Sequence, residues 1–331
     1  RGYRCYDHPT EIPKQETLSR FLKTLKNLET SGLEIEVLII VASPHDAKRY
    51  EQLIGRLVDE VRINYKTSIV FESSLAAIEN KIARKNPKIK NMLGLLGYGD
   101  IRNAALLMAN FFDYDAVYFL DDDVVIDKHN ALTRLIGSAK KENADIVGGV
   151  YTDKDGSYMP KKNNVFWKKV WNKNKYMSDV FKKIGKGPSQ TSLLFGGNLL
   201  ISKNAFKKVP FDPWIVRGED IDYAIMAQKF GFKTVMEPSA GVLHLPPVRE
   251  KEYRRFYWSK LRGDCYRFFY ERKKLMEMGI SVSSLSRYPG IFLNRLVGLR
   301  VIITSFLLSL YSLKWLEIES FWECIVNIKK V

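Results

Sequence analysis

The chain has few cysteines and no long uninterrupted hydrophobic run. Its 331 residues include three cysteines, Cys5, Cys265 and Cys324, which are scattered and form no CxxC pair. The sequence therefore encodes neither a disulfide framework nor a zinc site, and a reducing compartment fits this cysteine usage best. In the apolar C-terminal segment the longest charge-free run, residues 301–313, is shorter than the ~20 residues that a membrane-spanning helix needs.

Acidic residues are outnumbered by basic ones, 37 against 53, which gives a formal charge of +16. A positive field of this size favours anionic partners such as nucleic acid, an acidic membrane surface or phosphorylated small molecules, and a lysine-rich surface also serves solubility alone. The sequence has no recognised nucleic-acid motif, and its clustered acids would repel phosphates without a metal. We therefore expect no nucleic-acid partner.

Strands and helices alternate over the first half of the chain. A hydrophobic content of 46% is typical of a globular protein, and the length suits one large domain or one domain with an appendage. Apolar, β-branched runs predict strands, and apolar residues at helical spacing predict helices between them. The alternation predicts a doubly wound α/β sheet. The predicted strands are 35–43, 67–73, 116–120 and 144–151, and the predicted helices include 16–29 and 99–112.

Residues 152–190 interrupt this alternation. The segment is dense in lysine, with Trp167 and Trp171 interleaved, and we interpret it as an excursion over the active-site mouth or as a surface loop with one short helix. Regular secondary structure is predicted to resume at residues 192–202. The basic, aromatic stretch after residue 250 is predicted to be helical.

Three consecutive carboxylates, Asp121, Asp122 and Asp123, follow the apolar strand that ends at Leu120. Ligands of such sheets bind beyond the carboxyl ends of the strands, so these acids are expected to face a crevice. In an extended segment Asp121 and Asp123 point to one side and can share a divalent cation, which would offset their repulsion. Oxygen ligands suit Mg²⁺ or Mn²⁺. The alternative is a solvated acidic turn.

A second group of polar residues lies between residues 196 and 247. Gly196 and Gly197 permit close approach of the backbone to a ligand. Glu219 and Asp220 open a predicted helix, where acids also serve as simple caps. His244 comes at the end of the segment "AGVLH" and is a candidate third metal ligand, although a lone histidine is more often structural.

In this order the motifs resemble the GT-A glycosyltransferases, and family 2 most closely. The resemblance covers about residues 1–270. It implies a GT-A, Rossmann-like mixed but mainly parallel sheet flanked by helices, with a C-terminal helical extension. It rests on "RCYDHP", "GDIRNAALLMA", "FLDDDVVI", "FGGNLLIS", "RGEDIDYAIMAQKFGFK" and "VLHLPP".

The resemblance also implies roles for individual residues. Asp123, His244 and Asp121 would hold Mn²⁺ or Mg²⁺, which bridges the donor diphosphate, and Asp220 would be the general base with Glu219 orienting it or the acceptor. The residues implied on the donor side are Arg4, Tyr6, Asp7, Arg102, Asp121, Asp122, Gly196 and Gly197.

The implied activity is transfer of a hexose from a UDP- or GDP-sugar to an acceptor hydroxyl or lipid-linked acceptor, with inversion. The loop "VASPHD" lacks the Asp-rich motif usual in the family, so the base of the donor stays open. The Gln-x-x-Arg-Trp signature of processive synthases is absent, which favours transfer of one sugar. A retaining enzyme with the same metal site, or a sugar nucleotidyltransferase, is the alternative.

We expect a catalytic domain over residues 1–250, with a nucleotide-sugar half to about residue 125 and an acceptor half from about 126. The basic, aromatic and apolar helical extension would occupy 251–331. One stripe of its last predicted helix carries only apolar residues, which suits a membrane surface, the catalytic domain or a second subunit. The expected location is cytoplasmic; if the stripe binds a membrane, the chain would lie peripherally on the cytoplasmic membrane face. The sequence leaves the oligomeric state open.

Overall fold

The computed structural model describes residues 16–30, 32–42, 47–84, 94–160, 170–185, 187–215, 217–246, 254–281, 288–314 and 316–331. Arg4, Tyr6, Asp7 and Trp167 lie outside these ranges, so their predicted roles are not examined by the structure.

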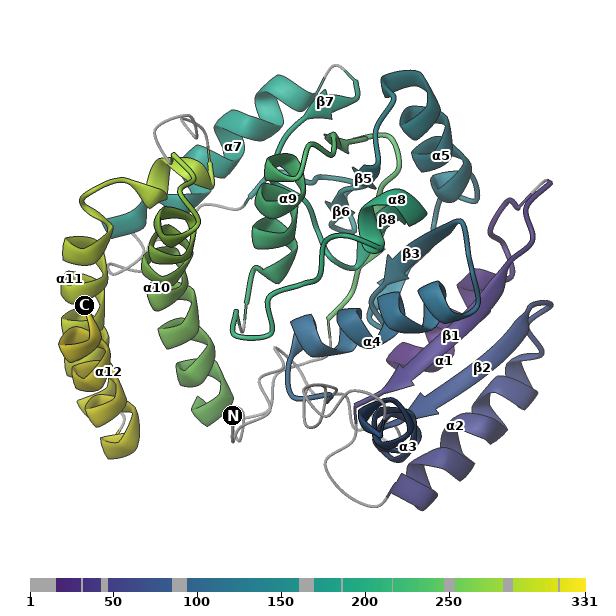
Figure 1. Ribbon diagram of the computed structural model, residues 1–331, viewed down its shortest axis with the longest axis horizontal. Helices are drawn as coiled ribbons and strands as arrows, with labels where there is room; N and C mark the ends of the chain where they lie inside the picture. Colours follow the sequence, from purple (N-terminus) through teal and green to yellow (C-terminus); the bar gives the residue numbers. More distant parts are fainter. Residues whose placement is uncertain are drawn as a thin grey trace.

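Helices lie on several sides of the strands in the view of Figure 1. The strands are β1 (Glu36–Val41), β2 (Lys66–Phe71), β3 (Ala116–Leu120), β4 (Val124–Val125), β5 (Ile146–Gly148), β6 (Tyr151–Thr152), β7 (Ser189–Gln190), β8 (Asn198–Ser202), β9 (Thr234–Met236) and β10 (Val242–His244). The helices are α1 (Thr17–Leu25), α2 (Ala47–Val61), α3 (Glu72–Ala83), α4 (Tyr98–Phe111), α5 (Ala131–Glu142), α7 (Lys173–Ile184), α8 (Lys203–Phe206), α9 (Glu219–Lys229), α10 (Arg254–Glu277), the 3₁₀ turn η3 (Gly290–Leu293), α11 (Val297–Leu313) and α12 (Ile318–Lys330).

The strands form a mixed α/β architecture, as predicted. The central sheet has the order β3-β8-β5-β9-β7, and the smaller sheets are β1-β2 and β4-β10-β6. Strand β8 runs antiparallel to both neighbours, β3 and β5, while β5 and β9 are parallel. Of the pairs formed by the described strands, those of β1 with β2, β10 with β6 and β5 with β9 are parallel and the other four are antiparallel. The mixed sheet is therefore confirmed. The expectation was that most strand pairs would be parallel, and fewer of the described pairs are parallel than that.

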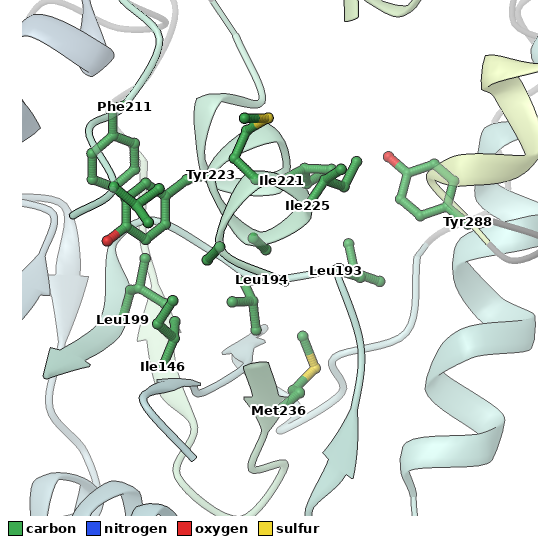
Figure 2. Close-up of a cluster of buried hydrophobic side chains, with 14 of the residues drawn as sticks. Ile146, Leu193, Leu194, Leu199, Phe211, Ile221, Tyr223, Ile225, Met236 and Tyr288 are labelled. Atoms are coloured by element: carbon green, nitrogen blue, oxygen red, sulfur yellow. The ribbon is translucent and has the colours of Figure 1, made fainter. Parts of the chain in front are cut away.

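The central sheet is covered by apolar side chains on both faces. On one face, residues of β5, β8 and β9 pack against α9 and the loop before it (Figure 2). There the rings of Phe211 and Tyr223 stack with centroids 4.1 Å apart. On the other face α1 and α5 contribute Leu22 and Leu135, both fully buried. Burial of this area, at about 25 cal/mol per Å², is the main term that stabilises the sheet.

The lysine-rich segment is part of this core. Its predicted short helix is present as α7, which buries Val180, Phe181 and Ile184. Trp171 is also buried, stacks on Phe268 and donates from Nε1 to Thr304 Oγ1 at 2.8 Å. The predicted short helix is therefore present, and its apolar side chains pack it into the core. The interpretation of the segment as an excursion over the active-site mouth stays a prediction.

Helix α10 joins the C-terminal extension to the main core. Phe268 and Leu275 of α10 and Val301 of α11 belong to the same hydrophobic cluster as the central sheet. The predicted domain boundary near residue 250 falls within residues 247–253, outside the described ranges, and stays a prediction. No helix in the described part of the chain has both the length and the apolar character to cross a bilayer.

Charged side chains of α10 also pack against the start of α9. Lys274 Nζ lies 2.5 Å from Asp222 Oδ1 and 3.0 Å from Asp212 Oδ2. Arg267 Nη1 donates to the carbonyl of Arg217 at 3.0 Å, and Arg267 Nε lies 4.0 Å from Glu271 Oε1. Burial raises the pKa of Glu271 to about 8, against the lowering effect of Arg267. The basic residues of this helix thus hold it against the domain.

Glu271 makes the stability of the fold depend on pH. Because its pKa is higher in the folded chain than in the unfolded chain, its contribution is complete below pH ~4.5 and declines up to pH ~8. We expect Glu271→Gln, which imitates the neutral carboxyl, to match the wild type near pH 5 and to unfold at higher urea near pH 9. Urea denaturation at several pH values tests this. The matched control is Glu277→Gln, on the exposed end of the same helix, which should not change the pH slope.

Candidate functional site

The acid triplet is brought to the other motifs by the pairing of two sheets. In the central sheet Leu120 of β3 lies opposite Asn198 of β8, so Asp121 follows directly beside Gly197. In the small sheet His244 of β10 lies opposite Val124 of β4. The amide of Leu245 donates to the carbonyl of Asp123 at 2.9 Å. Strand register therefore brings the end of β3, the glycine pair and His244 together.

Arg102 is the cation around which the carboxylates gather. It projects from the first half of α4 and is buried. Its Nη1 lies 2.8 Å from Glu219 Oε1, and its Nη2 lies 3.8 Å from Asp121 Oδ1. Burial alone would lower the pKa of Arg102, but Glu219, Asp121 and Asp220 raise it, so it stays protonated. The next residue, Asn103, donates to the carbonyl of Phe211 at 2.9 Å and accepts from its amide at 2.8 Å, which fixes the loop before α9.

Gly196 and Gly197 are needed for this arrangement. A Cβ on Gly196 would overlap the guanidinium of Arg102, and a Cβ on Gly197 would overlap the carboxylate of Asp121 and the hydroxyl of Tyr151. The glycine pair thus allows Arg102 and Asp121 to approach the backbone, a role that the sequence had assigned to approach of a ligand.

The predicted acid pair lies at the N-terminus of α9, after Gly218 in a left-handed conformation (φ +75°). Glu219 turns inward to Arg102, and burial raises its pKa to about 7 although Arg102 lowers it. Asp220 is half-buried, and its Oδ2 accepts from the Gly196 amide at 2.9 Å. The two neighbouring acids therefore differ. Glu219 is buried in an ion pair with Arg102, whereas Asp220 is half-buried and is oriented by the Gly196 amide.

Asp123 and His244 form the part of the site that could hold a metal. Asp123 is buried, and its Oδ2 lies 3.3 Å from Nε2 of His244. Burial lowers the pKa of His244, but the hydrogen bond and charge of Asp123 outweigh this and raise it. Carboxylate oxygen and imidazole nitrogen are suitable ligands for Mn²⁺.

Asp121 is engaged differently. It accepts from the Tyr151 hydroxyl at 2.7 Å as well as facing Arg102. Within the described ranges no three His, Cys, Asp or Glu side chains are grouped to hold a metal ion. The protein thus offers two adjacent ligands, Asp123 and His244. Two fit a cation such as Mg²⁺, which takes its other ligands from water and substrate phosphates. The set of three ligands predicted from the sequence, with Asp121 beside Asp123 and His244, stays a prediction.

Asp122, predicted on the donor side, faces another direction. The Thr17 hydroxyl of α1 donates to its Oδ2 at 3.3 Å. The turn at 121–123 thus sends Asp121 and Asp123 into the site and Asp122 toward α1, in keeping with the alternation expected from the sequence. Its role in donor binding stays a prediction.

Tyr151 was missed by the sequence analysis. Its hydroxyl donates to Asp121 and accepts from the Gly197 amide at 2.8 Å, while its ring stacks on His244 with centroids 4.8 Å apart. The same residue therefore contacts the acid triplet, the glycine pair and the histidine. The signal available was its position at the carboxyl end of the predicted strand 144–151, where ligand-binding residues gather.

Four carboxylates, of Asp121, Asp123, Glu219 and Asp220, are gathered around Arg102 and His244. Burial and the neighbouring Asp123 raise the pKa of Asp121, against Arg102, which lowers it. Such crowding of like charges is costly unless positive charge offsets it.

Removal of Arg102 should destabilise the fold in a pH-dependent way. We expect Arg102→Leu to cost about 3–5 kcal/mol near pH 8.5, because Glu219 becomes a buried charge without its partner. Near pH 5.5 the loss should be smaller, since Glu219 takes up a proton below its pKa of about 7. Urea denaturation at the two pH values measures both.

Adding Glu219→Gln to the Arg102→Leu variant should recover part of the lost free energy of unfolding, because no buried charge is then left without its partner. The control is Lys203→Leu, which removes a surface ion pair with Asp113 and should destabilise the fold far less than Arg102→Leu does near pH 8.5. Equal losses for Arg102→Leu at both pH values would contradict the assigned role of Glu219.

Comparisons with known proteins give structural similarity alone. No protein-family model and no curated protein sequence matches the chain. A mannosyltransferase from Pyrobaculum calidifontis, in complex with GDP-Man and Mn²⁺, is 11% identical with a TM-score of 0.49, and the match covers 100% of this chain and 76% of that one. TarS 1–349 of S. aureus in complex with UDP-GlcNAc is 12% identical with a TM-score of 0.46, covering 95% and 88%. A mycobacterial protein is 13% identical with a TM-score of 0.44, covering 75% and 71%.

Proposed function

We propose that the chain is a metal-dependent glycosyltransferase. It would move one hexose from a UDP- or GDP-sugar to an acceptor hydroxyl or lipid-linked acceptor, with inversion at the anomeric carbon. The observation that carries this proposal is the position of Asp220. This half-buried carboxylate accepts from the amides of Gly196 and Ile221, beside a buried Arg102 and a carboxylate–histidine pair that suits a metal.

On the donor side, Asp123 and His244 would hold Mn²⁺ or Mg²⁺. When bound, the metal neutralises the charge that develops on the leaving diphosphate. Tyr151 keeps Asp121 and the ring of His244 in place through one hydrogen bond and one stacking contact. Because Asp121 is already neutralised in part by Arg102, it is available for a hydroxyl of the donor rather than for the metal.

On the acceptor side, Asp220 would act as general base. Its carboxylate takes the proton of the acceptor hydroxyl while the oxygen forms a bond to the anomeric carbon. The bond from that carbon to the diphosphate oxygen breaks, and the electron pair leaves with the nucleoside diphosphate. Attack from the face opposite the leaving group inverts the configuration. The Gly196 amide keeps Asp220 oriented, and Glu219 stays paired with Arg102.

A retaining transferase with the same metal site and a sugar nucleotidyltransferase remain alternatives. The products discriminate among the three. Inversion and retention give glycosides of opposite anomeric configuration, read from the proton coupling of the anomeric carbon, and a nucleotidyltransferase releases pyrophosphate from a nucleoside triphosphate. We also propose a cytoplasmic location, which suits an enzyme that uses soluble nucleotide sugars.

Asp220→Asn should keep donor binding and lose transfer. An amide cannot accept the proton, so we expect kcat to fall by about 100- to 10,000-fold with the donor dissociation constant unchanged. Turnover and donor titration on the same preparation measure both. Transfer at the wild-type rate would exclude Asp220 as the base. The matched control is Asp127→Asn, an exposed carboxylate just after β4, which should leave both quantities unchanged.

Calorimetric titration with UDP and with GDP, each with Mn²⁺ and with EDTA, tests the donor site directly. We expect one nucleotide to bind only with the metal, and Asp123→Ala to lose that binding while the fold is kept. Binding that is equal in EDTA would contradict a metal site, and absence of binding to either nucleotide would contradict the proposed donor class.

A further inference from the structure

The exposed face of α11 is apolar along its whole length. Helices α11 and α12 lie side by side at one edge of the molecule, with α10 between them and the central sheet (Figure 1). The outward stripe is formed by large apolar side chains that are 41–57% exposed: Leu296, Leu299, Ile303, Phe306, Leu310 and Leu313. In water a helix normally turns such a stripe toward the core.

The opposite face of α11 is buried and carries both small polar and apolar side chains. Thr304, Ser305, Ser309 and Ser312 are each at most 1% exposed, and the buried apolar residues beside them are Val297, Val301 and Leu308. Two of the hydroxyls have protein partners that replace water: Thr304 Oγ1 accepts from Trp171 at 2.8 Å, and Ser309 Oγ donates to the Phe306 carbonyl at 2.7 Å. The helix therefore keeps its small hydroxyl side chains inside and places most of its large apolar side chains outside, the reverse of the usual arrangement of these residue types in water.

The apolar surface continues beyond α11. Leu316 and Ile318, in the turn and at the start of α12, are 85% and 62% exposed, and Trp322 and Val326 of α12 are 61% and 44% exposed. Aromatic and aliphatic side chains of this kind are typical of helices that lie in a membrane interface. A contiguous series of this length is more than scattered surface hydrophobics and marks an interaction site.

The charges that border the stripe favour an anionic surface. No aspartate or glutamate occurs between Glu277 and Glu317, so the acids nearest to the stripe of α11 are Glu317 and, on α12, Glu319 and Glu323. The exposed side chains of Arg295 and Lys314 stand at the two ends of the stripe, while Arg300 turns inward over the ring of Phe292 at 5.4 Å. The chain as a whole carries +16. Charge and apolarity together match the headgroup region of a bilayer that contains anionic lipids.

A second copy of the chain is less suitable as the occupant. The stripe has the 3-4-3-4-3 spacing of a coiled-coil seam. In a self-associating coil, however, the positions beside the seam carry charges of both signs. Here they carry Arg295, Arg300 and Lys314, with apolar Ile302 and Leu307 between them. Two copies would bring like charges together.

We propose that the stripe of α11, continued by the exposed apolar residues of α12, docks on the surface of a bilayer containing anionic lipids. The helix lies in the plane of the membrane, with the apolar side chains among the upper acyl chains and Arg295 and Lys314 at the phosphates. This inference does not depend on the proposed transferase activity, because it uses neither the site nor its ligands.

Flotation of the full-length chain with vesicles tests the proposal. Vesicles of phosphatidylcholine alone are compared with vesicles of phosphatidylcholine and phosphatidylglycerol in a ratio of 70 to 30. We expect the wild type to float with the anionic vesicles, and Phe306→Glu/Leu310→Glu to stay at the bottom. The control is Phe111→Glu, which changes a side chain 77% exposed at the end of α4 and should float like the wild type.

The charge variant Arg295→Gln/Lys314→Gln gives an independent measurement. We expect its partitioning onto anionic vesicles to fall about 30-fold, because each basic side chain at an anionic surface contributes about a fivefold gain. Circular dichroism tests whether each variant is folded. We expect the two double variants to fold, because the four substituted side chains, Arg295, Phe306, Leu310 and Lys314, are exposed.

Two results would overturn the proposal. The first is a wild type that floats with neither kind of vesicle. The second is a wild type that is dimeric by light scattering and is converted to a monomer by Phe306→Glu/Leu310→Glu, which would assign the stripe to a second copy of the chain.

Discussion

The buried guanidinium of Arg102 is the interaction on which the arrangement of the site depends. It lies between Glu219 at the start of α9 and Asp121 at the end of β3, residues that are nearly a hundred positions apart. A buried charge without its partner costs about 3–5 kcal/mol, so α4, α9 and β3 are held to one relative position. Asn103, the next residue on α4, adds two hydrogen bonds to the backbone of Phe211 and fixes the loop between β8 and α9.

The crowding of carboxylates has a cost that a ligand can remove. Asp121, Asp123, Glu219 and Asp220 outnumber the positive groups beside them, and burial raises the pKa of Asp121 and of Glu219. A site of this kind is more favourable when a cation occupies it, which is the physical link between the acid triplet and metal-dependent chemistry. The glycine pair is the steric counterpart, because any side chain there would displace Arg102 or Asp121.

The C-terminal helices have two different relations to the domain. Helix α10 is integrated, since Phe268 enters the main core and Arg267 and Lys274 bind the approach to α9. Helix α11 uses its small hydroxyl side chains for the inner contact and leaves its largest apolar side chains outside. Helix α10 thus supports the acids at the start of α9, and in our proposal α11 and α12 dock on an apolar surface.

Local sequence determined the elements and several of the residues that meet in the site. The strand 116–120 and the helix start at Glu219 were predicted closely, because apolar periodicity and strand-ending acids are local signals. Only the tertiary structure decided that the central sheet has β8 antiparallel between β3 and β5, since register and direction depend on distant partners. The same holds for Tyr151, whose three contacts come from segments far apart in the chain, and for Asp121, which tertiary packing turns toward Arg102. The apolar stripe of α11 was visible in the sequence, but its outward orientation depends on which face α10 and α12 cover, and that is a property of packing.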